Sequence, residues 1–251
     1  TVQVQVSDGS LTADKSFTIS VGDVAGVSLT GTNGNDLISP ANPIAGQAPG
    51  PEADTLNGGL GADTLVGGGG ADVLIGGAGL DTASYASATS AIALDMLDAS
   101  WVGALGDAKG DSLSGIEVVE GSAFNDTVLG TEVADTLNGN AGNDSLSGRG
   151  GADRLRGLDG NDTLDGGLGI DTLEGGNGDD VLVYDAADTL IDAGGGFDVL
   201  VLDAFQTVDL TAGLADQISG GGVARGFEGV DFSRLSAGVS FNGSTTANLV
   251  I

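Results

Sequence analysis

Hydrophobic and polar positions recur along this chain with a period of nine residues. From Gly139 the blocks GNAGNDSLS, GRGGADRLR, GLDGNDTLD, GGLGIDTLE and GGNGDDVLV share the pattern Gly, any, any, Gly, any, Asp, any, aliphatic, any. An earlier stretch repeats this pattern from Gly58 as GGLGADTLV, GGGGADVLI and GGAGLDTAS. A short fixed period is typical of a solenoid, in which each repeat packs on its neighbours.

The last three residues of each block predict a brief strand that points only its aliphatic side chain inward. The expected core residues are Leu65, Leu74, Val128, Leu137, Leu146, Leu155, Leu164, Leu173, Leu182 and Leu200. Glycine at the first and fourth places allows a tight turn with positive φ. Two turns and two strands close one coil, so residues two periods apart stack at about one strand spacing, roughly 4.8 Å.

Five segments are expected from the pattern. Residues 1–26 alternate like a hairpin at the end of a β-sandwich repeat, and residues 27–81 hold the first block, interrupted by an exposed Pro-rich loop, PANPIAGQAPGPE. Residues 82–120 lose the glycine pattern but keep apolar clusters such as Ile92, Leu94 and Met96, which indicate broader strands that continue the stack. Residues 121–201 hold the second block, and residues 202–251 are expected to form a β cap.

Composition raises the question of what stabilises such a coil. The chain has 251 residues with 47 Gly, 4% aromatic residues and a formal net charge of −29. A thin core without large aromatic side chains is poor at stabilising itself. The chain contains no Cys and no His, which excludes disulfides and the usual zinc, copper and haem sites. Hard cations with oxygen ligands remain as candidates.

The periodic aspartates supply such ligands. Stacking places Asp144 over Asp162 and Asp162 over Asp180. Two like charges a few ångströms apart repel by roughly 1 kcal/mol in water and by about 3 to 4 kcal/mol at an effective dielectric of 20. A divalent cation between successive loops reverses this repulsion. Carboxylates together with turn carbonyls suit calcium better than magnesium, which demands a tighter octahedron.

The nonapeptide pattern resembles the calcium-binding repeats of RTX proteins. That resemblance implies an all-β fold, a right-handed parallel β-roll, with calcium held between loops on the same side by the Asp of each block and by carbonyls of its turn. The implied ligands are Asp36, Asp54, Asp63, Asp72 and Asp81 in the first block, and Asp126, Asp135, Asp144, Asp153, Asp162, Asp171, Asp180 and Asp198 in the second. The implied turn residues are Gly58, Gly61, Gly67, Gly70, Gly76, Gly79, Asn125, Gly139, Gly142, Gly148, Gly151, Gly157, Gly160, Gly166, Gly169, Gly175 and Gly178.

Pairing these aspartates at twice the period predicts the number of ions. The first block gives the pairs 36 with 54, 54 with 72 and 63 with 81. The second gives 126 with 144, 135 with 153, 144 with 162, 153 with 171, 162 with 180 and 180 with 198. About six to nine calcium ions are therefore expected. Asp36 is the weaker candidate because its turn faces the insert, and Thr189 replaces the expected Asp, which weakens a site near Asp171 or Asp188.

Several other patterns are better explained by structure than by chemistry. Glycine-rich strings that resemble a dinucleotide-binding motif have no βαβ context around them. The outward threonines are interrupted by Arg154, Val73 and Val181, which argues against a flat ice-ordering array. Arg149, Arg154 and Arg156 fit charge compensation better than a glycan contact, and Trp101 fits packing better than sugar stacking.

Together these features favour a calcium-binding structural module of a secreted bacterial adhesin or surface protein. The segment SDGSLTADKSFTISV resembles the last strands of a cadherin-like or immunoglobulin-like extracellular repeat. The RTX resemblance implies export by a type I secretion system and folding outside the cell, where calcium is abundant, with adhesion to a host or neighbouring cell through other domains. The alternatives are the non-catalytic region of a secreted protease or lipase, and a ligand-binding or self-assembling surface-layer module. Catalysis, nucleic-acid binding and membrane insertion are not expected, given the absent His and Cys, the negative charge and the lack of a long apolar run.

Overall fold

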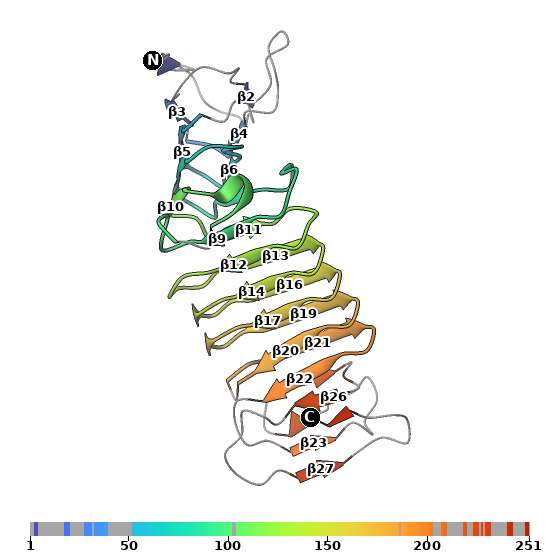
Figure 1. Ribbon diagram of the computed structural model, residues 1–251. Coiled ribbons are helices and arrows are strands. Elements are labelled where there is room, and N and C mark those ends of the chain that lie inside the picture. Colours follow the sequence, from blue (N-terminus) through green and yellow to red (C-terminus); the bar gives the residue numbers. More distant parts are fainter. Residues whose placement is uncertain are drawn as a thin grey trace. The chain divides into compact units, whose positions relative to one another are not determined.

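The computed structural model describes residues 31, 33–39, 52–101, 104–185 and 187–202, with the shorter pieces 3–4, 18–20, 28–30, 207–209, 218–219, 223–225, 227, 229–231, 240–242 and 249–250. The described chain is all-β and forms a parallel β-solenoid, as the sequence predicts (Figure 1). It divides into two compact units, Thr1–Ala123 and Phe124–Ile251. No helix in the described part is long and apolar enough to cross a membrane.

In the first unit, successive strands alternate between two parallel sheets. One sheet has the order β1 (Gln3–Val4), β3 (Ser28–Thr30), β5 (Thr55–Leu60), β7 (Val73–Ala78) and β10 (Ser112–Ser114). The other contains β2 (Thr18–Ser20), β4 (Leu37–Ser39), β6 (Thr64–Leu65), β8 (Thr82–Ser84) and β11 (Val118–Glu120). Strand β9 (Ala93–Asp95) and a 3-10 turn (Gly106–Ala108) lie between β8 and β10.

The pairing of the first strands corrects the predicted hairpin. Strand β1 pairs in parallel with β3, and β2 pairs in parallel with β4, so β1 and β2 lie in different sheets instead of pairing with each other. Alternating apolar residues predict a strand but not its partner, because any neighbouring edge offers the same backbone groups. The rest of the predicted hairpin and most of the Pro-rich insert fall outside the described residues.

Residues 82–120 do continue the stack, as predicted. Strand β10 pairs with β7, Ser112 lying beside Val73, and β11 pairs with β8, Val118 lying beside Thr82. The residues between β8 and β10 therefore form one enlarged coil. Its apolar residues Ile92, Leu94 and Met96 are buried, which explains why this stretch is hydrophobic without the nonapeptide pattern.

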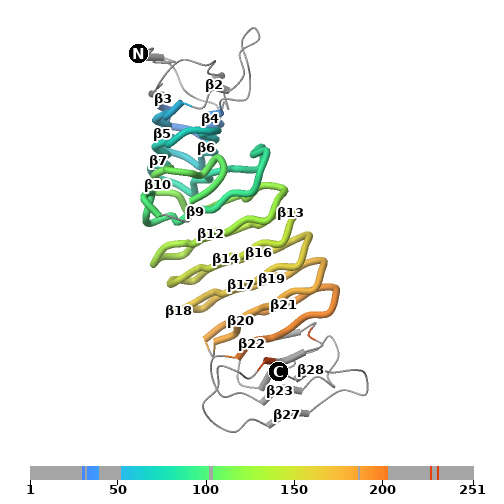
Figure 2. The backbone as a smooth tube through the Cα atoms, viewed as in Figure 1, coloured from blue at the N-terminus to red at the C-terminus, as the bar shows by residue number. Residues whose placement is uncertain are grey.

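The second unit repeats the coil with fewer interruptions (Figure 2). One sheet contains β12 (Thr127–Leu129), β14 (Ser145–Ser147), β17 (Thr163–Asp165), β20 (Val181–Tyr184) and β22 (Val199–Leu202), followed by β26 (Gly229–Asp231) and β28 (Leu249–Val250). The other contains β13 (Thr136–Ala141), β16 (Arg154–Asp159), β19 (Thr172–Asn177), β21 (Leu190–Gly195) and β25 (Val223–Arg225). The short strands β15 (Gly150–Gly151) and β18 (Leu168–Gly169) pair in parallel at a turn.

The predicted strands after residue 202 have two arrangements. Strands β25, β26 and β28 extend the parallel stack. Strand β23 (Thr207–Asp209) instead pairs antiparallel with β24 (Ile218–Ser219) and parallel with β27 (Ser240–Asn242) in a separate sheet. The C-terminal segment therefore contains both further coils and a small sheet of its own.

The core consists of aliphatic side chains that point inward from each sheet and stack from coil to coil. All ten residues that the sequence predicts to point inward are no more than 1% exposed. In the second unit Leu155 lies between Leu137 and Leu173 in register, so each aliphatic side chain packs against its equivalent in the next coil. Backbone hydrogen bonds between the turns, such as that from Gly160 N to the carbonyl of Asn177 at 2.8 Å, add further contacts between coils.

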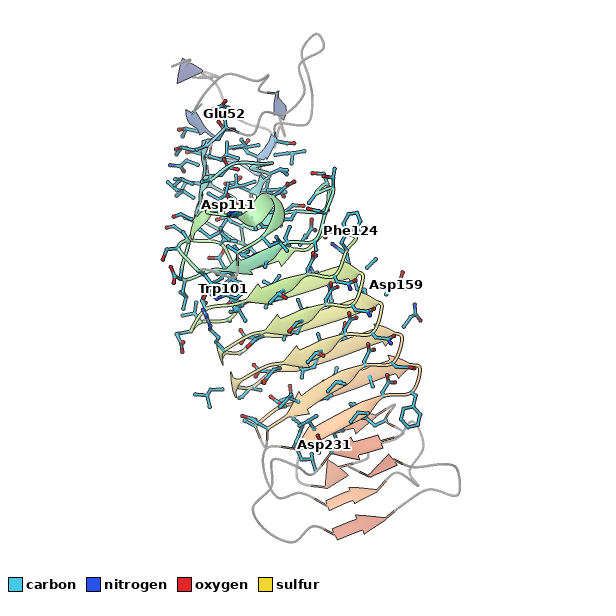
Figure 3. All side chains as sticks on the ribbon, viewed as in Figure 1. Glu52, Trp101, Asp111, Phe124, Asp159 and Asp231 are labelled. Carbon is cyan, nitrogen blue, oxygen red and sulfur yellow. The ribbon has the colours of Figure 1, made fainter. Side chains whose placement is uncertain are left out.

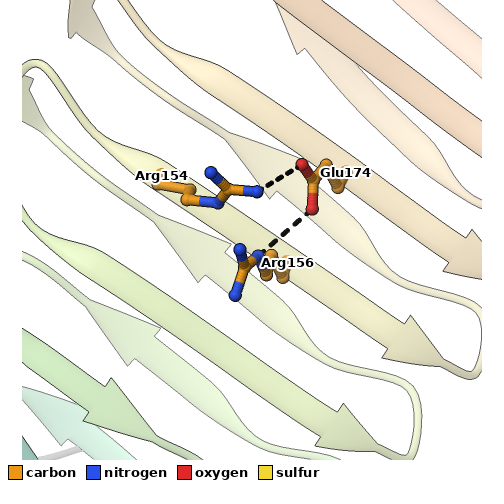
Figure 4. Close-up of polar contacts among 3 residues, drawn as sticks. All are labelled: Arg154, Arg156 and Glu174. Carbon is orange, nitrogen blue, oxygen red and sulfur yellow. Dashed lines mark hydrogen bonds and ion pairs between the residues drawn. The ribbon is translucent and has the colours of Figure 1, made fainter.

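The outward face of the strands is polar. On β16 and β19, Glu174 accepts from Arg154 Nη2 at 2.6 Å and from Arg156 Nε at 3.1 Å (Figure 4). Two of the three clustered arginines thus compensate a carboxylate on the next coil, as the charge-compensation interpretation predicts. Arg149 Nη1 donates to the carbonyl of Gly130 at 2.8 Å, which is again a contact between coils.

Candidate metal centre

The periodic carboxylates form four columns at the turns, each residue standing where the chain enters a strand. In the first unit, the Asp36 column comprises Asp36, Asp63, Asp81 and Glu117, and the Asp54 column comprises Asp54, Asp72 and Asp111. In the second unit, the Asp126 column comprises Asp126, Asp144, Asp162, Asp180 and Asp198, and the Asp135 column comprises Asp135, Asp153, Asp171 and Asp188.

One hydrogen bond links each column member to the next. The backbone N–H of Asp144 donates to Asp162 Oδ1 at 2.8 Å, and that of Asp162 donates to Asp180 Oδ1 at 2.8 Å. The backbone carbonyl of Asp144 also accepts from Thr163 N at 2.8 Å. Each carboxylate after the first in its column is therefore fixed in position by the preceding coil through one of its two oxygens.

The second carboxylate oxygen is buried without a donor. Among the described residues, Oδ2 has no hydrogen-bond partner in Asp63, Asp72, Asp81, Asp144, Asp153, Asp162, Asp171 and Asp180. These eight residues are no more than 2% exposed. A buried carboxylate oxygen without a donor is costly, and the same residue would relieve that cost by binding a cation.

Glycine at the first place of each block makes room for this oxygen. A Cβ on Gly157 would collide with Asp162 Oδ2 and would meet the carbonyl oxygen of Gly175 in the next coil at 2.7 Å. The same pair of oxygens, a column Oδ2 and a carbonyl of the next coil, flanks Gly58, Gly76, Gly139, Gly148 and Gly175. The carboxylate and the carbonyl thus converge from two successive coils on one small space. A Cβ on Gly67 would likewise collide with Asp72 Oδ2, and a Cβ on Gly166 with Asp171 Oδ2.

Glycine at the fourth place has a different role. Gly160 has a φ of +137°, and a Cβ on it would collide with the carbonyl oxygen of Gly142 in the preceding coil. Gly61, Gly70, Gly79, Gly142, Gly151, Gly169 and Gly178 also combine positive φ with a close backbone carbonyl. These residues let the turns stack closely.

This donor set fits calcium. No three acidic residues of the described part converge on one point, so a cation here would take at most two carboxylates, with backbone carbonyls for the rest. Calcium accepts such mixed oxygen ligands with flexible geometry. The residues that would hold it are the column aspartates and the turn carbonyls, with Asp144 and Gly157 as one example.

Burial also changes the proton affinity of the columns. Desolvation raises the pKa of Asp144 to about 7, with the neighbouring Asp162 and Asp126 adding to the rise. Desolvation likewise raises the pKa of Asp72, Asp153 and Asp180 to about 7, against the opposing effect of the backbone donor. The folded chain therefore holds carboxylates that a proton or a cation would neutralise.

The column of Asp36 differs from the prediction. The backbone N–H of Asp36 donates to Asp63 Oδ1 at 2.8 Å, so Asp36 stacks on Asp63, 27 residues later, and the predicted pair of Asp36 with Asp54 is wrong. Strand β4 confirms this register, because Leu37 pairs with Thr64. The insert after Ser39 adds one extra nonapeptide length to the coil, which moves Asp36 to the opposite column.

Two column members are absent from the sequence prediction. Asp111 Oδ1 accepts from Asp72 N at 2.8 Å across 39 residues, and Glu117 Oε2 accepts from Asp81 N at 2.9 Å across 36 residues. The 39-residue separation hides Asp111 from a search at multiples of nine, whereas Glu117 stands at such a multiple and escapes a search for Asp because it is Glu. The local string Asp111-Ser112-Leu113 keeps the Asp, any, aliphatic order, which is the signal that could have found Asp111.

Asp188 takes the column position at which the sequence has Thr189 instead of Asp. Strand β21 keeps the regular register, since Leu190 pairs with Thr172, yet Asp188 Oδ1 reaches Asp171 N at 3.2 Å. The register is regular again at Asp198, whose Oδ1 accepts from Asp180 N at 2.8 Å. All six predicted pairs of the second block are linked in this way.

Asn125 belongs to a separate ladder on the outside of the Asp126 column. Asn125 Oδ1 accepts from Asn143 N, Asn143 Oδ1 from Asn161 N, and Asn161 Oδ1 from Asp179 N, at 2.9 to 3.0 Å. These side chains are exposed, and they point toward the following coil, opposite to the aspartates beside them. Asn125 therefore joins coils, and its side chain lies apart from the buried carboxylates.

Comparison with known proteins agrees with this geometry. A family model described as RTX calcium-binding nonapeptide repeat (4 copies) matches residues 50–83, 129–164 and 156–191. These ranges include most of the column aspartates. A search of curated proteins found no match.

Proposed function

We propose that this chain, which contains RTX calcium-binding nonapeptide repeats, is the calcium-dependent structural module of a type I-secreted bacterial adhesin or surface protein. RTX repeat proteins are typically secreted. The module folds when it meets extracellular calcium and remains unfolded where calcium is scarce. Adhesion to a host or neighbouring cell then belongs to other domains that the module supports.

One observation carries this proposal. Eight buried carboxylates each keep one oxygen without a donor among the described residues, and the neighbouring coil adds a carbonyl at six of these places. Without a cation, each column stacks buried like charges, which opposes folding of a thin core. With a cation, the same oxygens bind two coils together. Calcium binding is thereby coupled to folding.

The proposal includes the absence of catalysis. The chain has no His and no Cys, and the described buried aspartates are held in the columns by backbone hydrogen bonds. A carboxylate that binds a structural cation is not available as a general acid or base.

A calcium titration from an EGTA-treated start tests the proposal. We expect a cooperative gain of β-structure by far-UV circular dichroism, heat of binding for several ions by calorimetry, and no comparable response to magnesium. The midpoint should lie at roughly 0.1 to 1 mM, the range of extracellular calcium modules. A chain that is already folded in EGTA and unchanged by calcium would contradict the proposal.

A pair of variants makes the test specific. Asp162→Asn removes the charge at a buried column position, whereas Asp159→Asn removes the same charge three residues away, where the side chain is exposed and projects away from the strands (Figure 3). We expect Asp162→Asn to raise the calcium midpoint about tenfold, equivalent to about 1.4 kcal/mol. Asp159→Asn should leave the midpoint nearly unchanged. Equal effects would mean that overall charge, not the column, sets the response.

A further inference from the structure

In three column carboxylates, protein groups donate to the second oxygen. The first is Asp135. Thr131 N and Thr131 Oγ1 both donate to Asp135 Oδ2, at 2.6 and 2.8 Å. In the next coil Asp153 stands at the same register, yet its Oδ2 has no donor among the described residues. The two neighbours therefore differ in which oxygen has a donor, because Asp135 Oδ1, unlike Asp153 Oδ1, accepts no hydrogen bond among the described residues.

The turn before Asp135 is rebuilt to supply these donors. Asn140, Arg149 and Leu158 take a positive φ at the second place of their blocks, as glycines do at the same place in other blocks, whereas Thr131 is not among the described residues with positive φ. Val133 N donates to Thr131 Oγ1 at 3.2 Å, which closes a local turn around the hydroxyl. The backbone here is shaped to cap a carboxylate.

The second exception is Asp111, at the end of the Asp54 column. Its Oδ1 accepts from Asp72 N, as in every column, but its Oδ2 accepts from the Tyr85 hydroxyl at 2.9 Å. Tyr85 is 3% exposed and Asp111 is 1% exposed, so this contact lies inside the enlarged coil. The phenol occupies the side of the carboxylate that is vacant in Asp72.

The third exception is Asp188. Its Oδ1 accepts from Asp171 N at 3.2 Å, and its Oδ2 accepts from Asp185 N at 2.9 Å. The one-residue shift that lets Asp188 reach the column also bends the chain so that Asp185 can donate to it. At Asp188 a backbone N–H donates to Oδ2, as a hydroxyl does at Asp111 and Asp135.

We propose that Asp111 and Asp188, in which both carboxylate oxygens accept from protein donors, bind no calcium and mark the limits of the calcium rows. In the Asp135 column the row then stops at Asp171, before Asp188. In the Asp54 column the row stops at Asp72, before Asp111. This inference rests on the proposed calcium function and specifies which carboxylates take part in it.

Isosteric variants within one column test the inference. In Asp153→Asn the amide oxygen is kept at the Oδ1 position by the backbone donor of Asp135, so the NH2 group replaces the ligand oxygen. In Asp188→Asn the NH2 group would face a backbone N–H, which should lower the melting temperature without loss of an ion. We therefore expect Asp153→Asn to lose at least one ion per chain and Asp188→Asn to lose none. The readout is bound calcium measured by equilibrium dialysis and elemental analysis at saturating calcium, with circular dichroism to check folding.

A second pair uses the other unit, in case one variant fails to fold. Asp72→Asn should lose at least one ion, whereas Asp111→Asn should keep the full number. Tyr85→Phe should lower the melting temperature in calcium without changing the number of ions. Loss of an ion from Asp188→Asn or Asp111→Asn would overturn the inference, as would loss from Tyr85→Phe, which would make the phenol a ligand. Failure of the unmodified chain to bind calcium would instead refute the proposed function.

Discussion

At the scale of single residues, glycine and aspartate in one block depend on each other. The first-place glycine leaves the space in which the carboxylate oxygen of the same block meets a carbonyl of the next coil. The carboxylate oxygen needs the space that a Cβ on the glycine would fill. That space in turn needs a polar group, because a carbonyl oxygen also faces it. This explains why glycine and aspartate keep the same spacing through both blocks.

Gly157→Ala should therefore disturb a calcium position directly. Its Cβ would collide with Asp162 Oδ2 and crowd the carbonyl of Gly175. We expect a loss of about 1 to 3 kcal/mol in calcium-loaded stability, typical of overpacking, together with a higher calcium midpoint. Gly195→Ala is the control, because a Cβ there meets nothing within 4 Å. Urea unfolding in saturating calcium measures both variants, and equal losses would contradict the steric explanation.

The sequence predicts most column residues because the period holds them, and the exceptions are local. Asp188 could not be found by spacing, since the column position in the strand register belongs to Thr189. Asp111 could not be found by spacing either, because the enlarged coil separates it from Asp72 by 39 residues. In both cases the position is decided by which side chain can reach the preceding backbone N–H, and that depends on the path of the loop.

At the scale of strands, the core and the outward face contribute unequally. Leu164 is fully buried between Leu146 and Leu182, one coil on either side. We expect Leu164→Ala to cost about 2 to 5 kcal/mol through lost burial and the cavity it leaves. Leu168→Ala, at a residue that is 76% exposed, should cost little. The comparison uses urea unfolding in calcium, and similar losses would show that the stacked leucines are not the core.

The ion pairs on the outward face should matter much less. Glu174 and its partners Arg154 and Arg156 keep 34 to 43% of their side chains exposed. Exposed pairs contribute between nothing and about 1 kcal/mol. We therefore expect Glu174→Gln to lower stability by less than about 1 kcal/mol in low salt, and by less again at high salt. A larger loss that persists in high salt would mean that the pair is shielded from solvent.

At the scale of the whole chain, the period predicts the solenoid but not the length of each coil. The aliphatic positions, the strand type and the two-strand coil follow from the nonapeptide pattern, because one buried residue per strand leaves few other arrangements. Coil length changes wherever a loop is inserted, and loop length costs little free energy. Asp36 therefore stacks on Asp63, and β1 and β2 join separate sheets, although local patterns suggest otherwise.

The buried columns also predict how the whole chain responds to pH without calcium. Burial raises the pKa of Asp72, Asp144, Asp153 and Asp180 to about 7 in the folded state, above the value of about 3.9 expected when unfolded. Protonation therefore favours the fold. The stabilisation is complete below pH of about 4 and is lost as the pH rises through about 7. In EGTA we expect β-structure to increase as the pH is lowered from 8 to 5.

Calcium should reverse the direction of this dependence, because it binds the same carboxylates in their charged form. The calcium midpoint should therefore rise as the pH falls from 7.5 to 5.5, since protons compete with the ion for the column oxygens. Circular dichroism in EGTA across this pH range, and calcium titrations at the two ends, measure the two effects on one sample. Asp159 is exposed, and its charge raises the pKa of Asp162 less than desolvation does, so Asp159→Asn should leave both effects nearly unchanged. A loss of β-structure on acidification in EGTA would mean that the columns are not the groups that oppose folding.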